Sequence, residues 1–198
     1  SPTGRLRGFE SIGADCGMRM AILGGDDAGG GVIWAPQVIE DARDHGLILA
    51  ETGRLYDSHK GEQLPDGVAP MSLLTEQQLK LFPEPTTAEV VPNAVARYLD
   101  LMAFSDRAPA KVIGADALLV DRPGFEVDFL SRPSAQTQAA ASDKDTVLMP
   151  ATGHWRVSWA DGSVTLNPGD TASIPAGIAY TLEPAMTGEA GIYRVVAT

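Results

Sequence analysis

The sequence predicts a mainly β protein, in which a mixed α/β extension at the N-terminus precedes a jelly-roll barrel. Two observations support this prediction. Glycine (21 residues) and proline (14 residues) are frequent in a chain of 198 residues, as is typical of a turn-rich β architecture. In addition, the C-terminal part of the chain has short apolar segments at roughly even spacing, which is the pattern of a jelly roll of about eight strands.

Residues 1–110 are predicted to form the extension, and residues 111–198 the barrel. Within the extension, alternating apolar residues over 18–22 predict a half-buried strand. Pro36 is placed to open a helix that a glycine then ends. Residues 47–56 are expected to form a small hairpin around a Glu-Thr-Gly turn.

Two further helices are expected in the extension. Thr75 is followed three residues later by Gln78, which is the spacing of a capping box, and Pro83 would end that helix. The next helix is predicted from residue 93 to residue 104, because apolar residues recur there on one helical face. The glycine-rich segment 24–31 is interpreted as a flexible turn, since it lacks the Gly-Lys-Ser/Thr end of a phosphate-binding loop.

The barrel is predicted from segments in which apolar and polar residues alternate. This alternation is clear over residues 125–130 and again over residues 155–159. Residues 160–163, Ala-Asp-Gly-Ser, are typical of the tight turn of a hairpin. The remaining strands are expected at residues 164–166, 171–174, 180–182 and 192–196.

One stretch of the barrel carries a spaced motif. Gly169 is followed after five residues by Pro175, then by Gly177, and after two more residues by Tyr180. This spacing resembles the second sequence box of the cupin superfamily, and Gly153 matches the glycine that ends the first box. Residues 123–197 therefore resemble a single cupin domain, which implies a double-stranded β-helix.

The resemblance also implies where a metal would bind. The first cupin box supplies two His and a Glu, and the second box supplies another His, which together hold iron, manganese, nickel or zinc. In this chain the corresponding positions are Ala140, Ser142, Thr146 and Tyr180, none of which is a good ligand. We therefore expect no metal and no other cofactor; if there is one, we expect a transition metal such as iron or zinc. The nearby substitutes are weak donors or solvated residues: Gln136, Gln138, Asp143 and Asp145.

The predicted ligand pocket consists of Thr146, His154, Trp155 and Tyr180, inside the barrel. His154 and Tyr180 are also the candidate catalytic residues, with the histidine as base and the tyrosine as acid. Trp155 and Trp159 are two residues apart and share one face of a strand. They are expected either to fill the core or to form an aromatic wall for a small apolar ligand.

The resemblance and the missing ligands together favour a cupin-like protein that binds a small molecule or has a regulatory or structural role. Two enzymatic alternatives stay open. One is a dioxygenase of the homogentisate or gentisate type, of which this chain would be the metal-free half. The other is a metal-free isomerase or epimerase that uses the acid–base pair above. The sequence does not decide whether the protein is an enzyme.

The charge balance bears on partners. With 15 basic and 26 acidic residues, the net charge is −11, which disfavours nucleic acid and anionic membranes as partners. The cupin resemblance implies a homodimer. The sequence has no signal segment and no apolar run of membrane-spanning length, so a cytoplasmic location is expected. Because the chain begins at Ser1, we expect a processed or partial chain.

Overall fold

The structure is a computed structural model that describes residues 12–14, 20–22, 33–82, 86–120 and 124–198. These residues divide into two compact units. We call residues 12–14 and 33–82 the N-terminal unit, and residues 20–22, 86–120 and 124–198 the β unit. The glycine-rich segment 24–31 lies outside the described residues, as do residues 18 and 19 of the expected strand; residues 20–22 are described and form no strand.

The N-terminal unit contains the elements that the sequence predicts over this range. Pro36 is the first residue of helix α1, where its missing N–H removes no hydrogen bond. The hairpin is present, with Leu47 paired to Asp57 and Leu49 to Leu55. Thr75 forms the predicted capping box with Gln78. The bounds are α1 Pro36–Asp44, β1 Leu47–Leu49, β2 Leu55–Asp57, η1 Ser58–Lys60 and α2 Glu76–Leu79.

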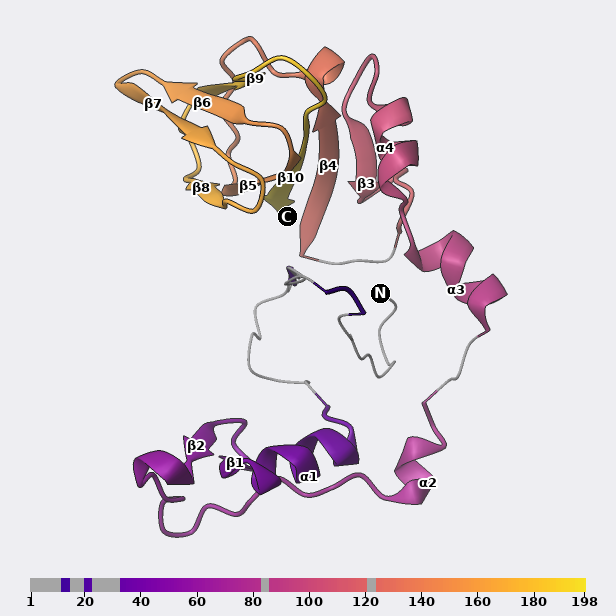
Figure 1. The fold of residues 1–198 in the computed structure, drawn as a ribbon, viewed down its shortest axis with the longest axis vertical. Coiled ribbons are helices and arrows are strands. Elements are labelled where there is room, and N and C mark those ends of the chain that lie inside the picture. The colour runs from indigo at the N-terminus through magenta and orange to yellow at the C-terminus, as the bar shows by residue number, and fades with distance from the viewer. Residues whose placement is uncertain (1–11, 15–19, 23–32, 83–85, 121–123) are drawn as a thin grey trace. The chain divides into compact units, whose positions relative to one another are not determined.

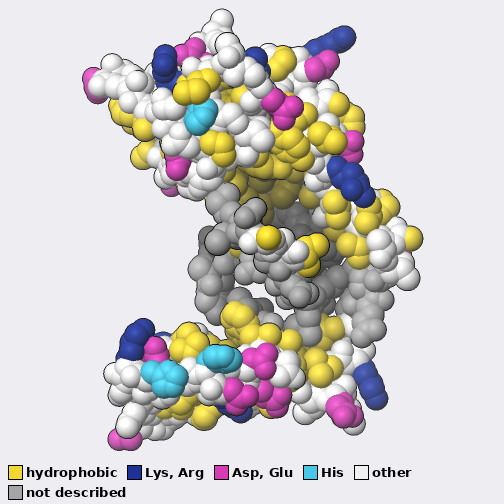
Figure 2. Space-filling model, in the orientation of Figure 1, with side chains coloured by type: hydrophobic (Ala, Val, Ile, Leu, Met, Phe, Trp, Pro, Cys, Tyr) yellow, Lys and Arg dark blue, Asp and Glu magenta, His cyan; other side chains and the backbone are white. Residues whose placement is uncertain are grey.

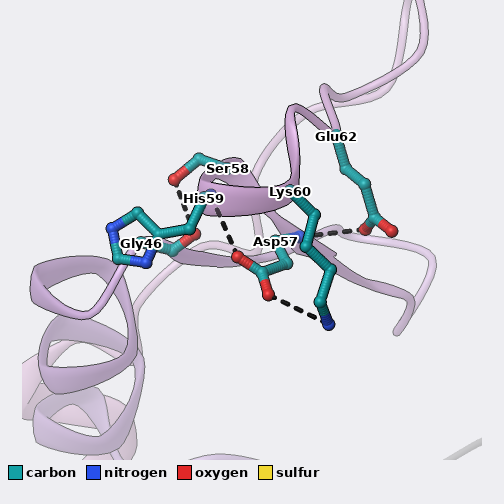
Figure 3. A network of polar contacts seen from close by, with 6 residues as sticks. All are labelled: Gly46, Asp57, Ser58, His59, Lys60 and Glu62. Carbon is teal, nitrogen blue, oxygen red and sulfur yellow. Dashed lines mark hydrogen bonds and ion pairs between the residues drawn. The ribbon is translucent and has the colours of Figure 1, made fainter.

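A network of polar contacts joins the end of α1 to the turn after β2 (Figure 3). Asp57 accepts a hydrogen bond from the backbone N–H of His59 at 3.0 Å and forms an ion pair with Lys60 at 3.2 Å. The Ser58 hydroxyl donates to the carbonyl of Gly46 at 2.8 Å. Because these residues lie close together in the sequence and bond to one another, we assign the network to local structure.

Replacing Gly46 by alanine is expected to destabilise the N-terminal unit by about 1–2 kcal/mol. Gly46 has φ +75°, and an added Cβ would lie 2.8 Å from His59 Nε2 and from Ser58 Oγ. Gly61 is the matched control, because its φ is +77° and nothing lies within 4 Å of an added Cβ. Hydrogen exchange of the α1 and β1 amides should rise more in Gly46→Ala than in Gly61→Ala; equal effects would show that only the backbone angle matters.

The β unit is mainly β, as predicted. Eight of its described segments are strands, β3 to β10, and they form two antiparallel sheets of order β3-β4-β10-β5-β8 and β7-β6-β9 (Figure 1). The sheets share one apolar core but do not close into a continuous barrel. The bounds are α3 Thr87–Ala94, α4 Tyr98–Phe104, β3 Ala110–Ile113, β4 Phe125–Ser131, η2 Arg132–Ser134, β5 Thr146–Thr152, β6 Trp155–Trp159, β7 Gly162–Leu166, β8 Ala172–Ile174, β9 Tyr180–Pro184 and β10 Gly191–Ala197.

The prediction of one helix over residues 93–104 is wrong, because two helices share this region. α3 begins earlier, where Thr86 and Glu89 form a capping box that the prediction did not use. Pro92 lies inside α3 and removes one backbone donor, which weakens the helix near its end. Val95 then takes an extended conformation, with φ −126° and ψ 116°, so a new helix has to start at Tyr98.

The five-stranded sheet separates two apolar cores. Leu130, Trp155 and Leu182 belong to the core between the two sheets. Val127 and Phe129 belong to a second core on the opposite face, where Leu101 of α4 packs against them. Strand β4 is therefore buried on both faces toward its end, and its Asp128 shares the inward face with Leu130, since alternate residues point the same way.

The surface of the β unit has no single-sign charged patch on the face that Figure 2 shows, where acidic and basic side chains are scattered among uncharged ones. None of the helices in the described part of the chain combines the length and apolar content needed to cross a membrane.

Candidate functional site

Polar side chains gather at one end of the space between the two sheets. Asp128 on β4 and Arg194 on β10 are paired in the strand register. By alternation they lie on the same face as Leu130 and Ile192, which are both buried in the core between the sheets. A carboxylate and a guanidinium therefore face an interior that is otherwise mostly apolar.

Arg194 is the centre of this group. Its Nη2 donates to Asp128 Oδ2 at 2.6 Å, and its Nη1 donates to Gln136 Oε1 at 2.9 Å. The side-chain amide of Gln136 in turn donates to the backbone carbonyl of Tyr180 at 3.1 Å, which connects the group to β9. We call Asp128, Gln136, Tyr180 and Arg194 the Arg194 cluster.

The charged side chains of the Arg194 cluster are only partly buried. The side chains of Arg194 and Asp128 keep 21% and 24% of their surface exposed. The Nε of Arg194 is buried and, among the described residues, finds no acceptor. An unpaired N–H inside a protein is costly and calls for an explanation.

Tyr180 supplies the phenol of the cluster and is 4% exposed. Burial raises the pKa of this phenol above its ordinary value, and the Asp128 charge adds to the rise, whereas the charge of Arg194 and a hydrogen bond with it oppose it. The phenol is therefore protonated at neutral pH and can act as a hydrogen-bond donor.

Alkaline pH is expected to destabilise the β unit in a way that depends on Tyr180. Burial also raises the pKa values of Tyr98 and Tyr193. The folded state thus holds these protons more tightly, and stability that is complete below the ordinary pKa of about 10 is lost as the pH rises through the folded-state values. Urea unfolding midpoints between about pH 8 and pH 11 should fall less steeply in Tyr180→Phe than in the parent chain. Identical slopes would contradict the effect of burial on this phenol.

Trp159 places an aromatic side chain at the same end of the space between the two sheets. It follows Trp155 and Val157 on the inward face of β6, and it pairs with Tyr180 in the register of β6 and β9. Trp159 as a whole residue is 42% exposed. An added Cβ on Gly162 would lie 3.2 Å from a ring carbon, so the absence of a side chain there lets the indole lie over the hairpin.

The structure brings two of the predicted pocket residues to this end of the space. Thr146 is 2% exposed and begins β5, where it pairs with Val196 of β10. It shares the face of Leu148, which belongs to the core between the sheets. Thr146 and Tyr180 therefore both line the end that holds Arg194.

The other two predicted pocket residues lie at the opposite end. His154 precedes β6, its Nδ1 lies 2.9 Å from the side-chain oxygen of Asn167, and its carbonyl accepts a hydrogen bond from Ala185 beyond the end of β9. Tyr180 begins that strand of five residues, so roughly 15 Å separates the two positions. Trp155 is fully buried and pairs with Pro184 at the end of β9. The structure does not bring the predicted acid–base pair together.

The residues that correspond to the cupin ligand positions take part in backbone contacts. Ala140 and Tyr180 exchange both backbone hydrogen bonds, and the carbonyl of Ser142 accepts from the N–H of Gly177 at 2.7 Å. Asp145, one of the possible substitute ligands, accepts from the N–H of Ala176 at 2.9 Å. Within the described residues no group of three or more His, Cys, Asp or Glu side chains is placed to hold a metal ion.

Sequence reasoning missed Asp128 and Arg194 and considered Gln136 only as a weak metal donor. The signal that could have found Arg194 is its position in β10, two residues after Ile192 on the inward face of a strand. Charged residues are almost never fully buried unless they are paired, so an inward-facing Arg indicates a partner on a neighbouring strand.

Comparison with solved structures finds similar proteins, among them proteins described as cupins. A protein from Neisseria meningitidis is 17% identical, with a TM-score of 0.41, and the match covers 52% of this chain and 99% of that one. A cupin-2 domain protein from Shewanella frigidimarina is 15% identical with the same TM-score, over 52% of this chain and 95% of that one. An RmlC-like cupin with a double-stranded β-helix fold from Methanocaldococcus jannaschii is 14% identical, with a TM-score of 0.39, over 47% and 81% of the two chains.

These likenesses concern the fold alone. The mainly β architecture predicted from the sequence is confirmed by the two antiparallel sheets. No protein-family model and no curated protein matches the chain.

Proposed function

We propose that this chain is a small-molecule-binding protein whose binding site is the Arg194 cluster, and that it binds its ligand without a metal held by the protein. One observation carries the proposal: a partly buried guanidinium–carboxylate pair lies on the inward face of the five-stranded sheet, beside the apolar core between the two sheets. Such pairs seldom add stability over apolar residues of similar size, because desolvating the charges offsets their attraction. A role in recognising a ligand supplies a reason for the pair.

The cluster has hydrogen-bonding capacity left for a ligand. A guanidinium carries five N–H groups; Arg194 gives one to Gln136 and one to Asp128 and shares a further hydrogen bond with the Tyr180 phenol, so N–H groups remain for a ligand. About a fifth of the Arg194 side chain is exposed. Convergent polar groups at the end of an apolar interior are typical of small-molecule sites.

A fragment screen tests this proposal directly. The ¹⁵N-labelled full chain, as purified and without chelator, is screened by NMR against small polar fragments. We expect hits to shift the indole N–H of Trp159 and the Nε–H of Arg194, and to leave the indole of the buried Trp155 unchanged. In Arg194→Met the same hits should bind at least about tenfold more weakly.

Arg156 offers a matched control for the fragment screen. It is also an arginine in an ion pair, with Glu183 at 3.6 Å, but its side chain is 49% exposed. It alternates with Trp155 and Val157, so it lies on the outward face of β6. Arg156→Met should bind the fragments as the parent chain does. Fragments that bind Arg194→Met as tightly as the parent chain would refute the proposed site.

The acid–base pair considered from the sequence would need the His154 imidazole within reach of the Tyr180 phenol. The only described histidine of the β unit is His154, which lies near the other end of β9. We therefore build the proposal on binding and not on that pair. The homodimer, the cytoplasmic location and the absence of nucleic-acid partners remain predictions.

A further inference from the structure

We infer that the ligand of the Arg194 cluster is an uncharged ring that bears hydroxyl groups, such as a monosaccharide, stacked on Trp159. This inference rests on the proposed function and names the chemical class of the ligand. Three features of the site support it: its charge, its exposed aromatic ring and the kind of polar groups that it offers.

The charge of the site disfavours an anion. Asp128 neutralises Arg194 at 2.6 Å, so the cluster offers a guanidinium without net positive charge. The loops at the same end, which lead into β5 and join β6 to β7, carry exposed Asp143, Asp145 and Asp161 against one exposed lysine, Lys144. A carboxylate or phosphate would meet a negative potential there, in a chain whose net charge is already −11.

The exposed indole favours a ligand with an apolar face. Trp159 is the tryptophan of β6 that stays 42% exposed, whereas Trp155 of the same face is completely buried. Its ring lies near Gly162, where an added Cβ would come within 3.2 Å of a ring carbon. A large exposed aromatic ring can cover the C–H face of a flat ligand ring and remove both from water.

The polar groups of the cluster match hydroxyls. A hydroxyl both donates and accepts, so it bonds equally to a guanidinium and to a carboxylate. Arg194 supplies donors, Asp128 supplies acceptors, and the amide of Gln136 supplies both. These planar side chains are already fixed by their mutual bonds at 2.6 and 2.9 Å, so little side-chain entropy is lost on binding.

A comparison of neutral sugars with their acids tests the inference. The probes are glucose, galactose and mannose and the three corresponding uronates, titrated into the ¹⁵N-labelled full chain while the tryptophan indole resonances are followed. We expect at least one neutral sugar to shift the Trp159 indole with a Kd in the millimolar range, which corresponds to about −4 kcal/mol. Its uronate should bind at least about tenfold more weakly.

Variants locate the sugar. Trp159→Ala and Arg194→Met should each weaken binding by about tenfold or more, while the outward Arg156→Met should leave it unchanged. Because Trp159 is half-exposed, its loss should not prevent folding, which circular dichroism checks.

The outcomes separate this inference from the proposed function. A uronate that binds as tightly as its neutral sugar, and does so only when Arg194 is present, would refute the inference that the ligand is uncharged. The proposal that the Arg194 cluster binds a small molecule would still hold. The same follows if no sugar shifts Trp159 while polar fragments do so. Sugar binding that is equal in Arg194→Met and the parent chain would overturn the inference as well.

Discussion

Replacing Gly153 by alanine is expected to destabilise the β unit by about 3 kcal/mol or more, the largest effect of any single methyl group that we predict. Gly153 has φ +68°, and an added Cβ would lie 2.7 Å from the Cβ of Ala190 and 2.7 Å from the carbonyl oxygen of Glu189. Because one obstacle is backbone, no rotation of a side chain relieves the contact. The segment before β10 would have to move.

Gly177 is the matched control for Gly153. It lies within the spaced motif from Gly169 to Tyr180 and has φ +80°, but nothing lies within 4 Å of an added Cβ. Gly177→Ala should therefore cost about 1 kcal/mol, which is the strain of the backbone angle alone. Urea unfolding of both variants measures the difference. An equal loss of unfolding free energy in the two variants would show that Gly153 is needed only for its backbone angle and not for close packing.

Replacing Arg194 by methionine is expected to destabilise the β unit by about 2–3 kcal/mol at neutral pH. The change leaves the Asp128 carboxylate and the Gln136 amide without the partners that they have at 2.6 and 2.9 Å. The effect should stay below that of breaking a fully buried pair, because about a fifth of each charged side chain is exposed.

A double variant tests whether the Arg194 pair stabilises the fold at all. Arg194→Met combined with Asp128→Asn removes both charges and also removes the unpaired Nε. We expect this variant to recover at least half of the loss, since the two residues interact directly. The exposed Arg156→Met should stay within about 0.5 kcal/mol of the parent chain. Strictly additive losses for the two single changes would contradict the coupling.

Local patterns predicted most of the fold. Alternating apolar residues marked β4 and β6, and the Thr75–Gln78 spacing marked α2. The prediction of the helical region failed because two signals competed. Apolar spacing suggested one helix, but the Thr86 capping box and Pro92 set different helix limits. The alternating pattern also grouped Leu130 with the polar Glu126 and Asp128, although the structure buries Leu130 in the core between the sheets. The sequence does not show that both faces of β4 are covered.

The site was harder to predict because its residues come from distant segments. Asp128 and Arg194 meet only through the pairing of β4 with β10, and Gln136 joins them from the loop after η2. The motif spacing pointed to Thr146 and Tyr180, which the strand register places toward the same end of the sheets. It could not show that His154 lies at the other end, since that depends on the register of β6 with β9.

The binding affinity of the strongest fragment before and after chelation tests the central claim most directly, because that claim is direct binding by the Arg194 cluster without a protein-held metal. The metal content of the same sample is determined by elemental analysis. We predict a Kd that changes by less than about twofold on chelation and rises by about tenfold or more in Arg194→Met. One transition metal per chain, whose removal abolishes binding, would contradict the account.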